Sequence, residues 1–350
     1  MIQDAIRDLV ERRDLNENQL RRVVGEIASG EATPAQIGGF LVALRNKGEE
    51  PAEIAVMASA LREYSVAIRP RVGGRVIDTC GTGGDSVKTF NVSTISSLVA
   101  AGGGAYVAKH GGRSVTSKCG SADLLERLGF RIEMEPLRVQ ESIETIGIGF
   151  MFAPSFHPAM KHVAPVRREL GIRTVFNLLG PVINPARVDA QLVGVYSPEL
   201  VPLIADVFSR LGTNEAIVVH ALEGMDEISV TGKTLVSWLR EGEITTKEYG
   251  PRDFGILEGA RLAEITEGDD PVLSTLDILN SRGGRGAKEQ MVLANSAAAL
   301  VLARRATTFP EGVELAKNSI LGGAAYKKLE ELVKFSGGEL TRFEEYAKSR

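Results

Sequence analysis

The stretch 78-DTCGTGGDSVKTFNVST-94 joins two kinds of sequence pattern. It follows a short apolar segment, residues 75–77, and leads into an apolar helical pattern that begins near Ser93. Three glycines fall within the four positions 81–84. This order predicts a strand, a glycine-rich turn and a helix, the unit from which α/β sheets are built. In such sheets ligands bind at the carboxyl ends of the strands, where this turn lies.

The glycine-rich turn has the properties of an anion-binding site. Glycines let backbone N–H groups approach an anion closely, and the start of a helix adds unpaired N–H donors and a favourable dipole. Polar side chains at the helix start add further donors, namely Thr89, Asn91, Ser93 and Thr94. Phosphate is the anion that best matches this set. The alternative is an ordinary glycine-rich turn followed by helix-capping residues.

Two familiar phosphate-binding motifs do not fit the turn. A P-loop requires glycines at two positions that Thr82 and Val87 occupy here. The dinucleotide fingerprint is matched by Gly81 and Gly83 but has Ser86 at its third glycine. The next strand also ends in a lysine and a histidine rather than in an acid for a ribose hydroxyl. The sequence therefore predicts a phosphate site of another kind.

After residue 73, short apolar runs alternate with helical patterns. Strands are expected at 76–77, 105–108, 131–134, 148–152, 191–196 and 216–220, with helices between them. This alternation predicts an α/β fold with a mainly parallel central sheet. Residues 1–65 carry only helical patterns, which predict a small all-helical N-terminal domain. Within it, Thr33, Pro34 and Gln36 predict the capped start of a helix.

A second loop, 109-KHGGRSVTSKCGSAD-123, carries an unusual density of basic side chains. They are Lys109, His110, Arg113 and Lys118, beside two adjacent glycines and several hydroxyls. Like charges at this spacing repel one another unless an anion lies among them. Sequential parallel strands tend to be neighbours, so this loop is expected beside the first one. Two adjacent anion sites predict a ligand with two separate phosphate groups; a solvated basic loop is the alternative.

Two pairs of charged side chains are candidates for the rest of the site. Asp226 and Glu227 follow the strand that ends at His220, and their oxygens suit Mg²⁺, which commonly bridges substrate phosphates. Arg167 and Arg168 lie in a helical segment, where an arginine can hold a carboxylate through two parallel hydrogen bonds. For both pairs the alternative is an ordinary surface position.

The composition argues against several classes of protein. Of the 350 residues 43% are hydrophobic, and 41 basic against 45 acidic residues give a net charge of −4, whereas a general nucleic-acid or membrane binder is expected to be basic. The two cysteines, Cys80 and Cys119, form no zinc or disulfide pattern. We expect both to be small buried residues, and we expect the protein to be cytoplasmic. The sequence has no apolar run long enough for a membrane span.

Together these motifs closely resemble the anthranilate phosphoribosyltransferases. The matching blocks are GTGGD at 81–85, FNVST at 90–94, KHGGRSVTSKCGSADLLE at 109–126, VRRELGIRTVFNLLGP at 166–181 and GMDEIS at 224–229. They cover most of the chain in a fixed order. The resemblance implies a glycosyltransferase (pentosyltransferase) of tryptophan biosynthesis. Such an enzyme transfers the phosphoribosyl group of phosphoribosyl pyrophosphate to the amine of anthranilate and releases pyrophosphate.

The resemblance also implies a domain arrangement. Residues 1–69 form a small helical domain that is completed by helices within about 160–187, and residues 70–350 form a large α/β domain that binds the phosphoribosyl donor. The active site is expected in the cleft between them, in a cytoplasmic homodimer that uses Mg²⁺, with two ions per active site. The resemblance implies no covalent nucleophile or dedicated base, and neither nucleic acid nor a membrane is an expected partner.

The resemblance assigns site residues through the matching blocks. The positions that contact phosphoribosyl pyrophosphate in the family are here Gly81, Gly84, Asp85, Thr89, Asn91, Val92, Ser93, Thr94, Lys109, His110, Gly111, Gly112, Arg113, Ser114, Val115, Thr116, Ser117 and Ser121. The metal positions are Ser93, Asp226 and Glu227. The anthranilate positions are Gly81, Gly112 and Arg167.

One position departs from the family pattern. The second loop normally reads KHGNR, with an asparagine that contacts anthranilate, whereas this chain has Gly112 there. The missing amide motivates one rival activity, transfer to a different aryl amine. The fold also serves pyrimidine nucleoside phosphorylases, although Arg167 and the GMDEIS block favour a transferase. The charge and the intact acidic pair disfavour a third rival, a non-enzymatic relative that binds nucleic acid.

Overall fold

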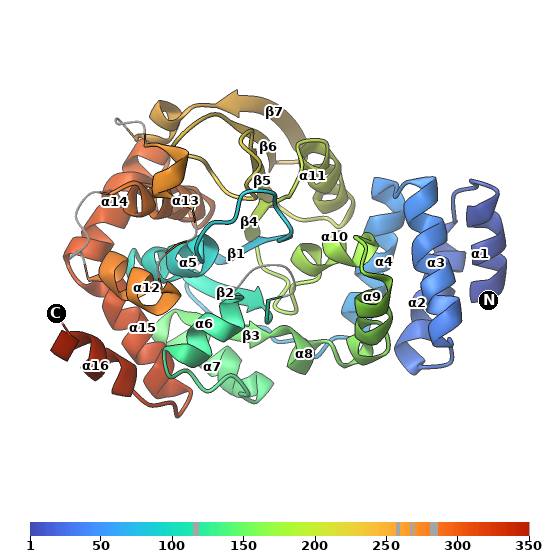
Figure 1. Ribbon diagram of the computed structural model, residues 1–350, viewed down its shortest axis with the longest axis horizontal. Helices are drawn as coiled ribbons and strands as arrows, with labels where there is room; N and C mark the ends of the chain where they lie inside the picture. The colour runs from blue at the N-terminus through green and yellow to red at the C-terminus, as the bar shows by residue number, and fades with distance from the viewer. Residues whose placement is uncertain (115–118, 257–259, 267, 269, 281–285, 350) are drawn as a thin grey trace.

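The N-terminal part of the chain forms four helices, α1 (Ile2–Val10), α2 (Glu17–Ser29), α3 (Pro34–Lys47) and α4 (Pro51–Glu63), which lie together in Figure 1. The computed structural model describes all residues except 115–118, 257–259, 267, 269, 281–285 and 350. The predicted cap of α3 is confirmed. Gln36 N–H donates to Thr33 Oγ1 at 3.3 Å, and Thr33 N–H donates to Gln36 Oε1 at 2.9 Å. Pro34 takes the first helical position, where its missing N–H costs nothing.

From Val76 onward, strands and helices alternate. The elements are β1 (Val76–Gly81), α5 (Val92–Gly102), β2 (Tyr106–Gly111), α6 (Ser121–Arg127), α7 (Pro136–Ile146), β3 (Ile148–Phe152), α8 (Ala153–Phe156), η1 (Pro158–His162), α9 (Ala164–Leu170), α10 (Val175–Val182), β4 (Ala190–Gly194), α11 (Leu200–Arg210), β5 (Glu215–Ala221), β6 (Thr234–Arg240), β7 (Glu243–Tyr249), η2 (Pro251–Phe254), η3 (Leu262–Glu264), α12 (Pro271–Leu279), α13 (Ala287–Leu302), α14 (Phe309–Leu321), α15 (Ala324–Phe335) and α16 (Thr341–Ser349). The predicted α/β class is therefore confirmed.

The strands of the described chain form one sheet in the order β3-β2-β1-β4-β5-β6-β7. Strands β1 to β5 pair in parallel, and β6 and β7 are antiparallel, which confirms the prediction of a mainly parallel sheet. The chain winds outward from β1 to β3 and then returns to β4 on the other side of β1. The crevice between the ends of β1 and β4 is therefore the topological switch point, where open α/β sheets bind ligands.

Two parts of the strand prediction are corrected by the structure. Residues 131–134 do not form a strand. Ile132 is buried there and Arg131 N–H donates to Ser336 Oγ at 3.0 Å, so the apolar pattern reflects packing against the C-terminal segment. The β6–β7 hairpin was not predicted, although residues 234–249 alternate as strands do. Its turn has positive φ at Glu241 and at the following glycine, the geometry that hairpins favour.

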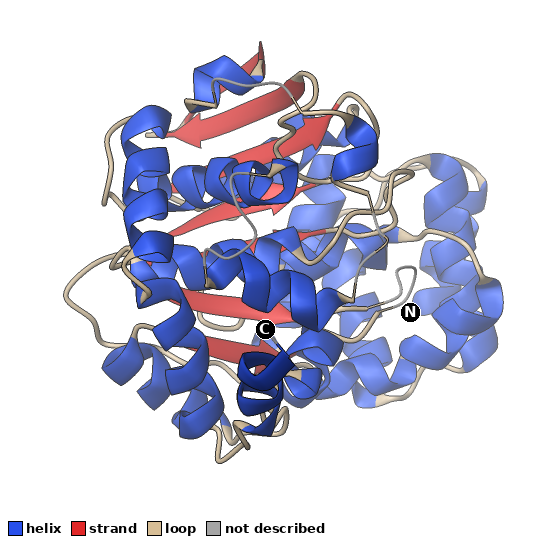
Figure 2. Ribbon diagram, turned by 60° about the vertical axis from the view of Figure 1, so that its left-hand side comes forward, coloured by secondary structure: helices blue, strands red, loops and turns tan. Residues whose placement is uncertain are grey.

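Two large apolar cores divide the faces of the sheet. One contains α5, α13 and the helices after them, and the other joins α1 to α4 with α9, α10 and α11. Figure 1 shows α9 and α10 between the N-terminal helices and the sheet, and Figure 2 shows the strands stacked with helices alongside. The segment from α9 to α10 thus lies on the N-terminal side of the molecule. Across the described residues, no helix combines the length and the apolar character that a membrane crossing requires.

Candidate active site

A cavity of about 270 Å³ opens where the loops after β1, β2 and β5 meet. Its lining residues are Cys80, Gly81, Thr82, Gly83, Gly84, Asp85, Lys88, Thr89, Phe90, Asn91, Val92, Ser93, Thr94, Lys109, His110, Gly111, Gly112, Arg113, Ser114, Cys119, Gly120, Ser121, Asp226 and Glu227. The structure thus brings together every described residue that was predicted for the donor and metal sites. The predicted residues Val115, Thr116 and Ser117 lie outside the described part of the chain.

The donor loop, residues 81–85, is shaped by glycine geometry and held from two sides. Gly83 and Gly84 have φ values of 63° and 76°, a region that residues with a Cβ rarely adopt. Thr82 N–H donates to the carbonyl oxygen of Gly194 at 2.9 Å, which fixes the loop to the end of β4. Gly83 N–H donates to Asp226 Oδ2 at 2.8 Å. The loop therefore lies between the switch point and the acidic pair.

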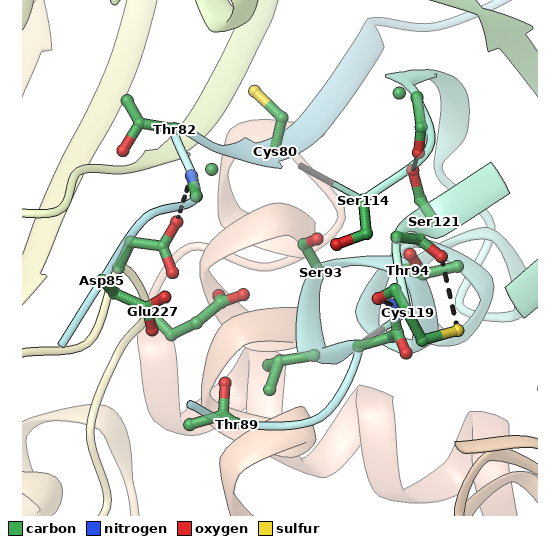
Figure 3. A pocket seen from close by; sticks show the side chains of 18 of the residues that line it. Cys80, Thr82, Asp85, Thr89, Ser93, Thr94, Ser114, Cys119, Ser121 and Glu227 are labelled. Atoms are coloured by element: carbon green, nitrogen blue, oxygen red, sulfur yellow. Dashed lines mark hydrogen bonds between the residues drawn. The ribbon is translucent and has the colours of Figure 1, made fainter. Parts of the chain in front are cut away.

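Helix α5 begins at Val92, so its N-terminus faces the same cavity. Its N-cap residue Asn91 does not cap the helix with its side chain; instead Asn91 Nδ2 donates to the carbonyl oxygen of Cys119 at 2.9 Å and connects the two loops. Figure 3 shows Asp85 and Glu227 on one side of the pocket, Ser114 and Ser121 on the other, and Ser93 between them. At the start of α5, Val92 N–H donates to the carbonyl oxygen of Phe90 at 2.7 Å and Thr94 N–H to that of Asn91 at 3.1 Å, while the backbone of Ser93 hydrogen-bonds to Glu227.

Lys109 brings a buried positive charge to the floor of the site. Its Nζ donates to the carbonyl oxygen of Thr79 at 2.7 Å and to Ser93 Oγ at 3.5 Å. Burial lowers the pKa of Lys109, and the nearby Asp78 carboxylate opposes that shift. Asp78 is itself buried and accepts a hydrogen bond from Asn184 Nδ2 at 2.7 Å, and burial raises its pKa to about 6. Asp78 was not predicted as a site residue, although it lies at the start of the stretch 78–94.

The acidic pair fits a divalent cation. Burial raises the pKa of Asp226, with Asp85 adding to the shift, and burial followed by Asp226 raises the pKa of Glu227. A cation among these carboxylates would relieve their repulsion. Within the described residues there is no cluster of three or more His, Cys, Asp or Glu suited to a metal. Mg²⁺ is commonly held by one or two carboxylates together with substrate phosphates and water, which is the contribution that Asp226 and Glu227 can make.

Two histidines form a neutral wall next to the second loop. The rings of His110 and His157 are buried with centroids 4.9 Å apart. Burial lowers the pKa of His110 to about 3 and that of His157 to about 4, so both are uncharged at neutral pH. The sequence analysis singled out His110 but treated His157 as structural. No sequence signal pairs the two, because β3 separates them in the chain.

The two cysteines, expected to be small buried residues, are only partly buried. Cys80 and Cys119 are partly exposed and line the cavity. Burial raises the pKa of both thiols, so neither is a thiolate at neutral pH. Lys88, another lining residue that sequence analysis missed, pairs with Asp85 at 3.1 Å. Its signal was its position directly after the glycine-rich turn.

Arg167 lies on α9, away from the walls of the cavity described above. Its side chain is half-buried, and its guanidinium carbon is 5.9 Å from the centroid of the Phe176 ring. Burial lowers its pKa. Its assignment to anthranilate stays a prediction. The neighbouring Arg168 is exposed.

Comparisons with known proteins agree with this geometry. The sequence model of the glycosyl transferase family, a/b domain, matches residues 73–326, and that of the family's helical bundle domain matches residues 3–65. The anthranilate phosphoribosyltransferase of Thiobacillus denitrificans is 46% identical over 338 residues, which is 95% of this chain and 97% of that protein.

Solved structures show the same relationship. The crystal structure of anthranilate phosphoribosyltransferase from Thermus thermophilus has a TM-score of 0.88 and 41% identity, covering 95% of this chain and 99% of that one. The Saccharomyces cerevisiae enzyme in complex with PRPP and Mg has a TM-score of 0.84 and 29% identity, covering 96% and 98%. The yeast enzyme is also known in complex with 4-fluoroanthranilate. This chain belongs to the glycosyl transferase family, in the group of the anthranilate phosphoribosyltransferases.

Proposed function

We propose that this protein transfers the 5-phosphoribosyl group from phosphoribosyl pyrophosphate to the amine of anthranilate, with Mg²⁺ and release of pyrophosphate, in tryptophan biosynthesis. The observation that carries the proposal is the convergence of three loops, after β1, β2 and β5, on one cavity. The relatives support it, because the yeast structure holds PRPP and Mg and the bacterial relative is 46% identical over nearly the whole chain.

The donor site follows from the two glycine-containing loops. Backbone N–H groups of the donor loop and the hydroxyl groups of Ser93 and Thr94 at the start of α5 bind one anionic group, and the second loop with Arg113 and Ser114 binds another. Lys109 places a fixed positive charge between them. Asp226 and Glu227 would hold Mg²⁺, which when bound supplies positive charge to the pyrophosphate oxygens.

The reaction needs stabilisation of a leaving group more than it needs a base. As the bond between ribose C1 and the pyrophosphate oxygen breaks, negative charge grows on the leaving group and positive charge on the sugar ring. Backbone N–H groups of the donor loop are already in place, so they lower the energy of this charge-separated transition state without reorganising. The amine nitrogen then forms the new bond to C1, and its proton leaves to pyrophosphate or water. An aromatic amine that is correctly oriented requires no covalent nucleophile from the protein.

The acceptor side is assigned to Arg167, Gly81 and Gly112. We place the anthranilate carboxylate at the Arg167 guanidinium, because an arginine fork matches a carboxylate and orients the amine. The neutral pair His110 and His157 adds no charge beside Gly112. An uncharged wall suits the aromatic ring of the acceptor.

Several finer parts of the proposal rest on the resemblance to the family. They are two Mg²⁺ ions per active site, a homodimer, a cytoplasmic location, and the division into residues 1–69 and 70–350 with the active site in the cleft. The common apolar core of α1 to α4, α9 and α10 supports the addition of residues from 160–187 to the helical domain. Analytical ultracentrifugation tests the dimer, and metal titration of the donor complex tests the number of ions.

The experiment that tests the activity follows the loss of anthranilate fluorescence when phosphoribosyl pyrophosphate and Mg²⁺ are supplied. We expect consumption of anthranilate with equimolar release of pyrophosphate. A panel of substituted anilines tests the rival with a different acceptor. Thymidine with phosphate tests the nucleoside phosphorylase rival. Turnover of thymidine, or of another amine with anthranilate left untouched, would overturn the proposal.

A further inference from the structure

Arg173 contacts the donor loop although it belongs to a different part of the molecule. It lies in the short turn between α9 and α10, and its Nη2 donates a hydrogen bond to the carbonyl oxygen of Gly84. A Cβ on Gly84 would be 3.5 Å from Arg173 Nε, so the guanidinium lies close to this backbone. Gly84 has a φ of 76°, a conformation that glycine adopts readily.

The contact crosses from the N-terminal side of the molecule to the sheet. Val166 of α9 and Val175 and Phe176 of α10 belong to the apolar core that contains α1 to α4, so the turn that carries Arg173 is fixed to that core. Gly84 follows β1 of the central sheet. The same turn begins directly after the helix that carries Arg167. The Arg173 side chain therefore connects the segment that carries Arg167, the residue predicted to bind anthranilate, with the donor loop.

Tyr196 holds the Arg173 side chain in place. The guanidinium carbon of Arg173 is 4.0 Å from the centroid of the Tyr196 ring, a cation–π arrangement. Tyr196 N–H in turn donates to Thr82 Oγ1 at 3.1 Å, inside the donor loop. Burial raises the pKa of Tyr196, and the charges of Arg45 and Glu49 near the end of α3 also act on it. Tyr196 thus connects the Arg173 side chain with the donor loop.

We propose that Arg173, supported by Tyr196, is a positioning residue that holds the donor loop in its phosphate-binding conformation from the acceptor side of the site. The inference rests on the proposed function and adds a residue that the cavity walls do not include. Arg173 acts through the Gly84 carbonyl and not on the reacting atoms. Without this contact the donor loop is less ordered, so binding of phosphoribosyl pyrophosphate must also order the loop and is therefore weaker.

The test compares steady-state constants of three variants with the wild-type enzyme. Arg173→Met removes the charge and the donor, and we expect the KM for phosphoribosyl pyrophosphate to rise about tenfold, as for one lost hydrogen bond to a charged group. The kcat and the KM for anthranilate are expected to stay within about twofold. Arg173→Lys keeps a cation that can reach the carbonyl and is expected to recover most of the affinity. Tyr196→Leu removes only the ring platform and is expected to give a smaller rise of about threefold.

The controls separate this inference from the proposed function. Wild-type turnover of anthranilate tests the function alone. Arg210→Met removes an exposed arginine of α11 that pairs with Asp206 at 3.1 Å, and it should leave both KM values unchanged. The melting temperature of each variant is measured to detect general destabilisation. An unchanged KM for the donor in Arg173→Met, or an equal loss in all constants with a lower melting temperature, would overturn the positioning role.

Discussion

Asp226 Oδ2 accepts a hydrogen bond from the backbone N–H of Gly83 at 2.8 Å, which joins the acidic pair to the donor loop. Two glycines make this approach possible, because a Cβ on Gly81 or Gly194 would overlap atoms of Asp226. The predicted metal position and the predicted phosphate position are therefore neighbours in one rigid unit. A metal bound at Asp226 would therefore lie next to a phosphate bound at the loop, as the proposed reaction requires.

The acidic pair is expected to control the dependence on Mg²⁺. Asp226→Asn combined with Glu227→Gln removes both negative charges while keeping the shapes of the side chains. We expect the Mg²⁺ concentration for half-maximal rate to rise at least about tenfold, because neutral amides bind this ion poorly. A magnesium titration of initial rates measures it. Glu248→Gln, an exposed change on β7, is the matched control, and a superimposable titration for the double variant would remove the pair from the metal site.

Arg167 is expected to determine the affinity for the acceptor. Arg167→Ala removes a carboxylate partner, so the KM for anthranilate should rise about tenfold or more while the KM for the donor changes little. Arg168→Ala is the control, because this neighbour is exposed on the same helix. Initial rates at varied anthranilate measure both variants. If Arg167→Ala kept the wild-type KM for anthranilate, the carboxylate would have to bind elsewhere.

Substitutions of the adjacent glycines Gly111 and Gly112 in the second loop are expected to change KM in opposite directions. A Cβ on Gly112 would lie 3.9 Å from Ala153 Cβ, an ordinary contact, whereas a Cβ on Gly111 would overlap Ser121 Oγ. Gly112→Asn should therefore fold normally and, by restoring the family's amide, lower the KM for anthranilate. Gly111→Ala should raise the KM for the donor, because Ser121 must move. Steady-state kinetics of both variants measure these KM values. A higher KM for anthranilate in Gly112→Asn together with an unchanged KM for the donor in Gly111→Ala would contradict the loop geometry.

The sequence located the three loops correctly because each of them follows a strand with a strong apolar pattern. Patterns of this kind report neighbours in the chain, and they cannot report contacts between distant residues. Asn184 meets Asp78 across 106 positions, and Arg173 meets Gly84 across 89. Both contacts depend on how α10 returns to the sheet, which no local motif encodes. The same limit explains why residues 131–134 were mistaken for a strand, since burial against the C-terminal segment gave them a strand-like pattern.

The buried histidines are expected to weaken the fold in acid. The pKa of His110 is about 3 and that of His157 about 4, both below the ordinary value of 6.5. Below pH 6.5 the unfolded chain therefore binds protons that the folded chain does not, and the free energy of unfolding falls as the pH decreases towards 4. At pH 5 the free energy of unfolding is lower than at neutral pH by about 2 kcal/mol for each histidine.

Replacement of one of these histidines isolates the effect. His157→Gln removes a titrating group, so the variant should lose about 2 kcal/mol less than the wild type between pH 7 and pH 5. Urea denaturation at the two pH values gives the free energies of unfolding. Equal losses in the two proteins would show that His157 takes up its proton in the folded state as readily as in the unfolded chain.

The proposed function requires the loops after β1, β2 and β5 to bind one doubly phosphorylated sugar together with its metal. A crystal structure of this protein with phosphoribosyl pyrophosphate and Mg²⁺ tests it most directly. We expect pyrophosphate against the donor loop and the start of α5, with Mg²⁺ at Asp226 or Glu227. A donor bound outside this cavity, or a metal that contacts neither carboxylate, would contradict it.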